Sequence, residues 1–104
     1  MSDYVYVPPV PGNSSDNDDV VVDGTVGGVL LLNANPKRRT ALIVNIGEAE
    51  MRVTTDGTPP SATRGKIVPP GAQLELTSPY CPAGEVRAIR MGDVDTCANA
   101  SEVT

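Results

Sequence analysis

Residues 40–55, TALIVNIGEAEMRVTT, decide the fold of this chain. Alternate residues of an extended strand point to opposite faces, so the first seven residues would present apolar side chains on both faces. One face would carry Leu42, Val44 and Ile46, and the other would carry Ala41, Ile43 and Asn45. A strand with two apolar faces is typical of the centre of a sheet. The sequence therefore predicts a central strand over residues 40–46.

The rest of this stretch predicts a second strand. Gly47 and Glu48 form a turn signal, and between Ala49 and Thr55 apolar or small side chains alternate with polar ones. This alternation indicates a strand with one buried face and one face exposed to solvent. We expect residues 49–55 to be the hairpin partner of the central strand.

Short apolar runs separated by turn signals continue on both sides. Further strands are predicted at residues 20–22, 29–32, 66–68, 73–77 and 85–91 and in the first half of 94–103. The apolar positions change phase near Ala88 and Ile89, which predicts a bulge or a two-sided strand. Ten Gly and ten Pro favour tight turns over helices. We expect an all-β fold, a small antiparallel β-sandwich or jelly-roll-like barrel of seven to eight short strands with an extended N-terminal arm.

The composition limits the core of this fold. The 104 residues suffice for one domain. They include no Phe, Trp or His, and their three aromatic residues are Tyr4, Tyr6 and Tyr80. The core must therefore be aliphatic, without the rings that each bury about 150–250 Å². We expect a thin margin of stability that oligomerisation or a partner would support.

Charge divides the chain into two parts. Residues 1–36 contain five Asp and no Lys or Arg, whereas residues 37–104 contain eight basic and eight acidic residues. This asymmetry predicts an extended acidic arm and linker over residues 1–19 and a β-sandwich body over residues 20–104. Residues 12–19 are polar and lack apolar side chains, so we expect them to form a flexible linker.

The arm is the first candidate for binding. Prolines at positions 8, 9 and 11 exclude residues 4–11 from the interior of a sheet. Two of the three tyrosines nevertheless lie there, interleaved with valine and proline, which is unusual for a segment that is only solvated. The candidate partner-binding residues are Tyr4, Val5, Tyr6, Val7, Pro8 and Pro9. Incidental contact with the body of the chain is the alternative.

The residues that most enzymes use are missing. Without His the chain lacks the usual general base and metal ligand, and it has no glycine-rich phosphate-binding motif. Two Cys sixteen positions apart do not make a zinc site. The carboxylates of residues 16–19 could hold calcium weakly, although a solvated linker is the favoured interpretation. We expect no catalysis, no cofactor and no metal site.

Two other classes of partner are disfavoured. Nucleic-acid binding needs clustered cations, whereas the net charge is −5. No apolar run exceeds four residues, while a membrane span needs about twenty. The first residues do not resemble a signal peptide, so we expect synthesis in a cytoplasm.

Two small groups of residues leave alternatives open. Lys37, Arg38 and Arg39 could bind a phosphate or an acidic partner surface, or could form a solvated strand end that resists aggregation. We retain all three as candidate partner-binding residues. For Cys81 and Cys97 a buried, hydrophobic role is favoured over a disulfide or a reactive thiol.

Three segments carry a resemblance to a known family. They are residues 31–47 (LLNANPKRRTALIVNIG), 51–53 (MRV) and 67–76 (IVPPGAQLEL). The order of an N-P-x-R turn, a strand ending in Asn, a variable loop, a P-P-G turn and an L-E-L strand resembles small structural proteins of tailed bacteriophages. The match covers roughly residues 29–91. The resemblance implies a compact β-sandwich module, found as a capsid decoration (cement) protein or in tail and fibre components.

The leading hypothesis joins this resemblance to the composition. It is a non-enzymatic virion protein that decorates and stabilises the capsid as a homotrimer, located on the capsid surface after synthesis in the host cytoplasm. Its partners would be the major capsid protein and other copies of itself, with no nucleic acid or membrane. The alternatives are a tail or fibre module of the same fold, or a lectin-like sandwich that binds a ligand through residues 56–64.

Overall fold

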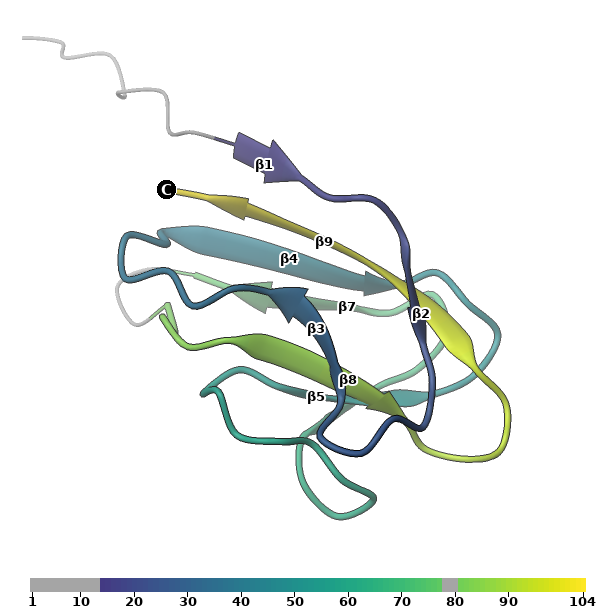
Figure 1. Cartoon of the computed structure of the whole chain (residues 1–104). Helices are drawn as coiled ribbons and strands as arrows, with labels where there is room; N and C mark the ends of the chain where they lie inside the picture. Colours follow the sequence, from purple (N-terminus) through teal and green to yellow (C-terminus); the bar gives the residue numbers. More distant parts are fainter. Residues whose placement is uncertain (1–13, 78–80) are drawn as a thin grey trace, which may run out of the picture.

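Nine strands within the described residues, 14–77 and 81–104, form two antiparallel sheets that pack face to face in the computed structural model (Figure 1). The strands are β1 (Ser14–Asp16), β2 (Val20–Val22), β3 (Val29–Leu32), β4 (Thr40–Asn45), β5 (Met51–Thr54), β6 (Lys66–Val68), β7 (Gln73–Leu76), β8 (Val86–Arg90) and β9 (Thr96–Val103). The first sheet has the order β1-β9-β4-β7, with β2 also paired to β9, and the second has the order β3-β8-β5-β6. The predicted all-β antiparallel sandwich is confirmed.

The strand β1 lies in the stretch predicted to be a flexible linker, and it adds one strand to the seven or eight expected. Both β1 and β2 pair with β9, at opposite ends, and Ser14 lies opposite Val103. Between the two short strands, Asn99 Nδ2 donates to the carbonyl of Asn17 (3.0 Å) and to Asp19 Oδ1 (2.9 Å). Hydrogen bonds to β9 therefore hold a polar segment that has no apolar side chains to bury.

The central strand forms where the sequence predicts it, because β4 pairs with β9 on one side and with β7 on the other. The expected hairpin of β4 with β5 is wrong. The strand β5 belongs to the second sheet, where it pairs with β6 and β8, so residues 46–50 carry the chain from one sheet to the other. Alternation predicts a half-buried strand, but it does not specify the sheet, since both sheets bury one face.

The buried Asn45 side chain holds this crossing. Its Nδ2 donates to the carbonyls of Ala49 and Val68 (both 2.8 Å). Its Oδ1 accepts from Gly47 N (3.1 Å) and from Thr96 Oγ1 (2.8 Å). Both polar atoms of the amide are thus satisfied, and the end of β4 is tied to β6 and β9.

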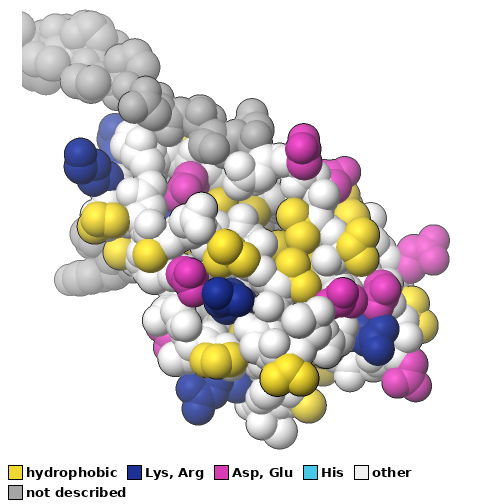
Figure 2. Space-filling view, viewed as in Figure 1, with side chains coloured by type: hydrophobic (Ala, Val, Ile, Leu, Met, Phe, Trp, Pro, Cys, Tyr) yellow, Lys and Arg dark blue, Asp and Glu magenta, His cyan; other side chains and the backbone are white. Residues whose placement is uncertain are grey.

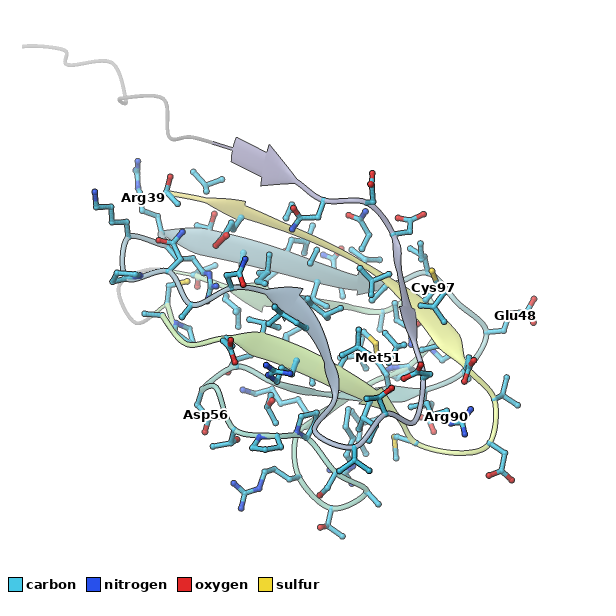
Figure 3. The ribbon with its side chains drawn as sticks, in the orientation of Figure 1. Arg39, Glu48, Met51, Asp56, Arg90 and Cys97 are labelled. Atoms are coloured by element: carbon cyan, nitrogen blue, oxygen red, sulfur yellow. The ribbon has the colours of Figure 1, made fainter. Side chains whose placement is uncertain are left out.

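The core between the sheets is aliphatic, as the composition requires. Its largest fully buried apolar side chains are Ile43, Met51, Val22, Val53 and Val86. Met51 lies between the two layers (Figure 3). Small residues on β9, Ala98 and Ala100, also face this interior, so the sheets pack around small and branched side chains.

Of the bulge or two-sided strand predicted near Ala88 and Ile89, the two-sided strand is present, and the bulge lies in the neighbouring β3. Pairing of β8 with β5 is continuous, whereas the register of β8 with β3 shifts between Leu30 and Leu32. The shift leaves both Leu31 and Leu32 buried, which is the expected effect of a bulge. The strand β8 is instead two-sided, since Ala88 is buried and Ile89 is half-buried beside β5.

The strand β9 is longer than predicted. The sequence indicates a strand in the first half of residues 94–103, but β9 continues to Val103 and is bordered by β1, β2 and β4. It is therefore an interior strand of the first sheet, and the strands that flank it come from the first half of the chain.

Candidate functional site

One end of the sandwich gathers segments that are distant in sequence. Ser14 and Thr40 both lie opposite Val103, and the Arg39 backbone N–H donates to the Val103 carbonyl (2.7 Å). Figures 1 and 3 show β1, the start of β4 and the end of β9 together at this end, next to the labelled Arg39. The arm residues 4–9 lie outside the described residues. Because the described chain begins at Ser14, the arm joins the body at this end.

The basic turn that precedes β4 stands at the same end. Asn35 shapes it, since Asn35 Oδ1 accepts from Lys37 N (3.0 Å) and the Asn35 carbonyl accepts from Arg38 N (3.1 Å). Lys37 and Arg39 are exposed. These two side chains remain candidates for contact with an acidic partner.

Arg38 has a different role from its two neighbours. Its side chain is 0% exposed, and its Nε lies 2.9 Å from Glu102 Oε1. Its two terminal nitrogens donate to the carbonyls of Pro82 (2.7 Å), Gly84 (3.0 Å) and Asn33 (2.7 Å). The guanidinium is thus buried, and all three of its nitrogens are hydrogen-bonded within the body. The sequence predicts neither, since it indicates a partner-binding residue or a solvated strand end. Glu102 is 64 positions away, so no local pattern indicates this ion pair.

A surface hollow of about 290 Å³ lies beside the arm junction, and the sequence did not predict it. It is lined by residues 40–42 of β4, 75–77 at the end of β7 and 101–103 of β9. We call it the outer hollow, because Leu42 lies opposite Ser101 and Glu75 on the face of the first sheet that points away from the core. In the sequence, the apolar second face of residues 40–46 is the feature that could have indicated this hollow.

The apolar side chains of that second face continue along β4 and become more exposed towards its end. Leu42 and Val44 are half-buried, and Ile46, just after the strand, is 47% exposed. Ile46 N donates to the carbonyl of Cys97 (2.9 Å), whose cross-strand neighbour Val21 is also exposed. The outer face of the first sheet is therefore more apolar at its centre than a solvated sheet needs to be.

The loop considered for ligand binding lies elsewhere, in the β5–β6 connection. A hollow of about 200 Å³ there is lined by residues 53–56, Thr58 and residues 64–66. Asp56 Oδ1 accepts from Thr58 N (3.1 Å) and from Thr58 Oγ1 (2.6 Å). These hydrogen bonds favour the carboxylate and lower the pKa of Asp56 below its usual 3.8.

Replacing Thr58 with valine is expected to raise the pKa of Asp56 towards 3.8. The side-chain hydrogen bond from Thr58 is the largest cause of the lowered value, and valine cannot donate it. The effect on stability should be present at neutral pH and disappear as the pH falls through the lowered pKa. Carboxyl carbon shifts in an NMR titration measure it. Asp23, which Thr25 holds in the same way, is the internal control and should not change.

The two cysteines are free thiols at separate places. Burial is the main cause that raises the pKa of Cys81, which disfavours a reactive thiolate. Over residues 14–77 and 81–104, no cluster of three or more acidic or Cys side chains is arranged to hold a metal ion. In the same residues, no helix is long and apolar enough to cross a membrane.

Charge does not single out another surface on the face shown in Figure 2. Acidic and basic side chains are interspersed there with hydrophobic ones. Pairs such as Arg87 with Glu85 (3.1 Å) and Arg90 with Asp95 join opposite charges within the body. The candidate site is therefore the end that carries the arm junction, Lys37, Arg39 and the outer hollow. The chain matches no protein-family model, and no curated protein is significantly similar to it.

Proposed function

We propose that this chain is a non-enzymatic structural protein of a tailed-bacteriophage virion. It decorates and stabilises the capsid as a homotrimer, and its N-terminal arm contacts the major capsid protein or neighbouring subunits. It is made in the host cytoplasm and resides on the capsid surface. The resemblance of residues 29–91 to such proteins suggests this setting, and the β-sandwich fold agrees with it.

The observation that carries the proposal is the position of the arm junction. The exposed Lys37 and Arg39 stand at the end where Ser14 joins the body, so arm and basic turn can engage one surface together. The backbone of β1 is hydrogen-bonded to β9, which gives the arm a fixed origin on the sheet. A segment tethered in this way can bind by strand addition or by docking of its proline-rich part.

Trimeric attachment would supply affinity that a single arm lacks. Ordering an extended segment costs conformational entropy, so one arm alone would bind weakly. Three arms on a three-fold site act at a high effective concentration, which can strengthen attachment by about 10²–10⁴-fold. This arrangement also suits a body with an aliphatic core and a thin margin of stability.

Deleting residues 1–13 is expected to weaken attachment to shells of the parent phage by about 100-fold or more. The deletion spares β1 and every other strand, so the body should keep its fold. Co-sedimentation of the purified protein with shells that lack it measures attachment, and an NMR spectrum checks the fold. Exchanging Val26, which is 97% exposed in the turn before β3, for serine is the control and should not affect attachment.

Attachment that survives the deletion would contradict the role of the arm. Electron microscopy of particles that carry the labelled protein distinguishes a position on the capsid from one on the tail. Label on the tail would favour the tail or fibre module. Specific, saturable binding to a glycan array, lost when Asp56 or Arg64 is replaced, would favour the lectin-like alternative.

A further inference from the structure

We propose that the outer hollow is the receptor for residues 4–11, the arm of a neighbouring copy of this chain. This inference rests on the proposed function, in which the arm contacts neighbouring subunits, and it names the surface that receives the arm. It follows from the chemistry of the hollow, from its size, and from the place where the arm joins the body.

The hollow presents an apolar floor within a polar rim. Directly paired residues on neighbouring strands share a face, so Leu42 stands beside Ser101 and Glu75, and Thr40 stands beside Val103. The residues between them, such as Ala41, are buried in the core on the other side. The half-buried Leu42 and Val103 thus have hydroxyl and carboxylate groups around them.

The size of the hollow suits a few side chains better than a whole ligand or domain. Its volume of about 290 Å³ is at the lower end of the range of about 300–1,000 Å³ that is usual for ligand pockets. It is open at the surface of a sheet, across three strands. An extended peptide segment that inserts one or two rings is the occupant that this shape favours.

The arm carries the matching chemistry. Residues 4–11, YVYVPPVP, are apolar except for the two tyrosine hydroxyl groups. In an extended chain Tyr4 and Tyr6 point to the same side, so both rings can face one surface. A buried tyrosine needs a partner for its hydroxyl, and Glu75 and Ser101 at the rim can accept from it. The body contains no Phe or Trp, and its one tyrosine, Tyr80, lies outside the described residues.

The arm starts next to the hollow. Ser14 lies opposite Val103, which is part of the lining. Tyr4 is ten positions from Ser14, so an extended arm can reach up to about 33–36 Å from the edge of its own sheet. Because β1 is antiparallel to β9, the first described residue of β1 lies beside the last residue of β9, at one end of the sheet. A neighbouring copy at this end would be within the reach of the arm.

Exchange between copies also agrees with a closed assembly. Each chain has one arm, in residues 4–11, and one outer hollow, lined by β4, β7 and β9. Pairing between two different patches is heterologous, and a rotation of the right size closes it into a ring. A ring of three in which every hollow is filled by the next arm is the homotrimer of the proposed function.

The test measures self-association of the full-length protein by light scattering and sedimentation, without any capsid. One variant damages the receptor, Leu42→Asp, and another damages the arm, Tyr4→Ser with Tyr6→Ser. Each is expected to fall from an oligomer to the mass of a monomer, while Val26→Asp, the exposed control, keeps the mass of the wild type. In an equal mixture one variant supplies intact arms and the other intact hollows. A dimer of the two, joined by one contact, should therefore form at high protein concentration, while the ring stays open.

A second measurement does not depend on the Leu42 variant being folded. The methyl NMR signals of Leu42 and Val103 should show upfield ring-current shifts in the wild type that disappear in the double tyrosine variant. The inference is overturned if that variant keeps the wild-type mass, if these methyl shifts do not change, or if the mixture stays monomeric. Association with unchanged shifts would place the trimer contact elsewhere. Attachment to shells is measured separately. If deletion of the arm abolishes attachment but leaves self-association unchanged, the proposed function stands and this inference fails.

Discussion

Replacing Arg38 with methionine is expected to lower the free energy of unfolding by about 3–5 kcal/mol. The buried guanidinium donates to four oxygen atoms, those of Glu102 Oε1 and the carbonyls of Asn33, Pro82 and Gly84. Methionine occupies similar space but donates no hydrogen bond, so the three carbonyls would lose this donor. The Glu102 carboxylate would lose its counter-charge and keep only the hydrogen bond from Asn35 Nδ2 (3.2 Å). Domains of this kind are stable by about 5–15 kcal/mol in total, so the loss would be a large share of the stability.

Denaturant titration of the full-length protein measures this loss. The neighbouring exposed Lys37 is the matched control, and Lys37→Met should change the free energy of unfolding by less than about 0.5 kcal/mol. The Arg38→Lys variant should fall between the two, because an ammonium keeps the charge beside Glu102 but cannot reproduce the planar set of donors. A loss below about 1 kcal/mol in Arg38→Met would show that the buried cluster does not stabilise the fold.

Replacing Asn45 with leucine is expected to cost about 3 kcal/mol or more. Leucine has a similar volume, so the loss would come from polar groups rather than from a cavity. The carbonyls of Ala49 and Val68 would lose this donor, and Thr96 Oγ1 would lose its acceptor. Gly47 N would keep only the Cys97 carbonyl (3.1 Å) as acceptor. All of these contacts lie at the crossing between the sheets, where water cannot easily replace the amide.

The Asn45→Asp variant tests the same site, and its loss of stability should depend on pH, unlike that of the leucine variant. At neutral pH a carboxylate would face two carbonyl oxygens in a buried place, so the loss should be at least as large as for leucine. Burial would raise the pKa of the new carboxyl, and its protonated form regains one donor. The loss should therefore shrink as the pH falls. Denaturant titrations at several pH values measure it, with Asn33→Asp on the exposed turn as control. A loss that does not depend on pH would contradict the assigned hydrogen bonds.

The sequence predicts which segments become strands better than it predicts their partners. Alternation and short apolar runs bounded by turn signals indicate β2 to β8, and that information is local. The partner of β5 depends on the crossing at residues 46–50, which is held by the Asn45 side chain and by the close approach of Gly47 to Thr96. That contact joins residues about fifty positions apart, and no pattern within either strand reports it.

For the candidate site, too, the sequence predicts the segments but not their surroundings. Charge and turn signals located residues 37–39, but only the fold separates the buried Arg38 from the exposed Lys37 and Arg39. The apolar second face of β4 is visible in the sequence, where it predicts a strand at the centre of a sheet. Only the sheet order shows that this face points away from the second sheet, which makes it a surface.

The placement of β9 between β1, β2 and β4 has a consequence for biosynthesis. These three strands are translated early, yet each needs residues 96–103 as its neighbour. In a nascent chain β1 and β2 must therefore stay unpaired until that stretch has left the ribosome, whereas β4 can pair with β7 beforehand. A prematurely terminated product lacks the strand that joins β1 and β2 to β4, so it cannot anchor the N-terminal segment to the sheet.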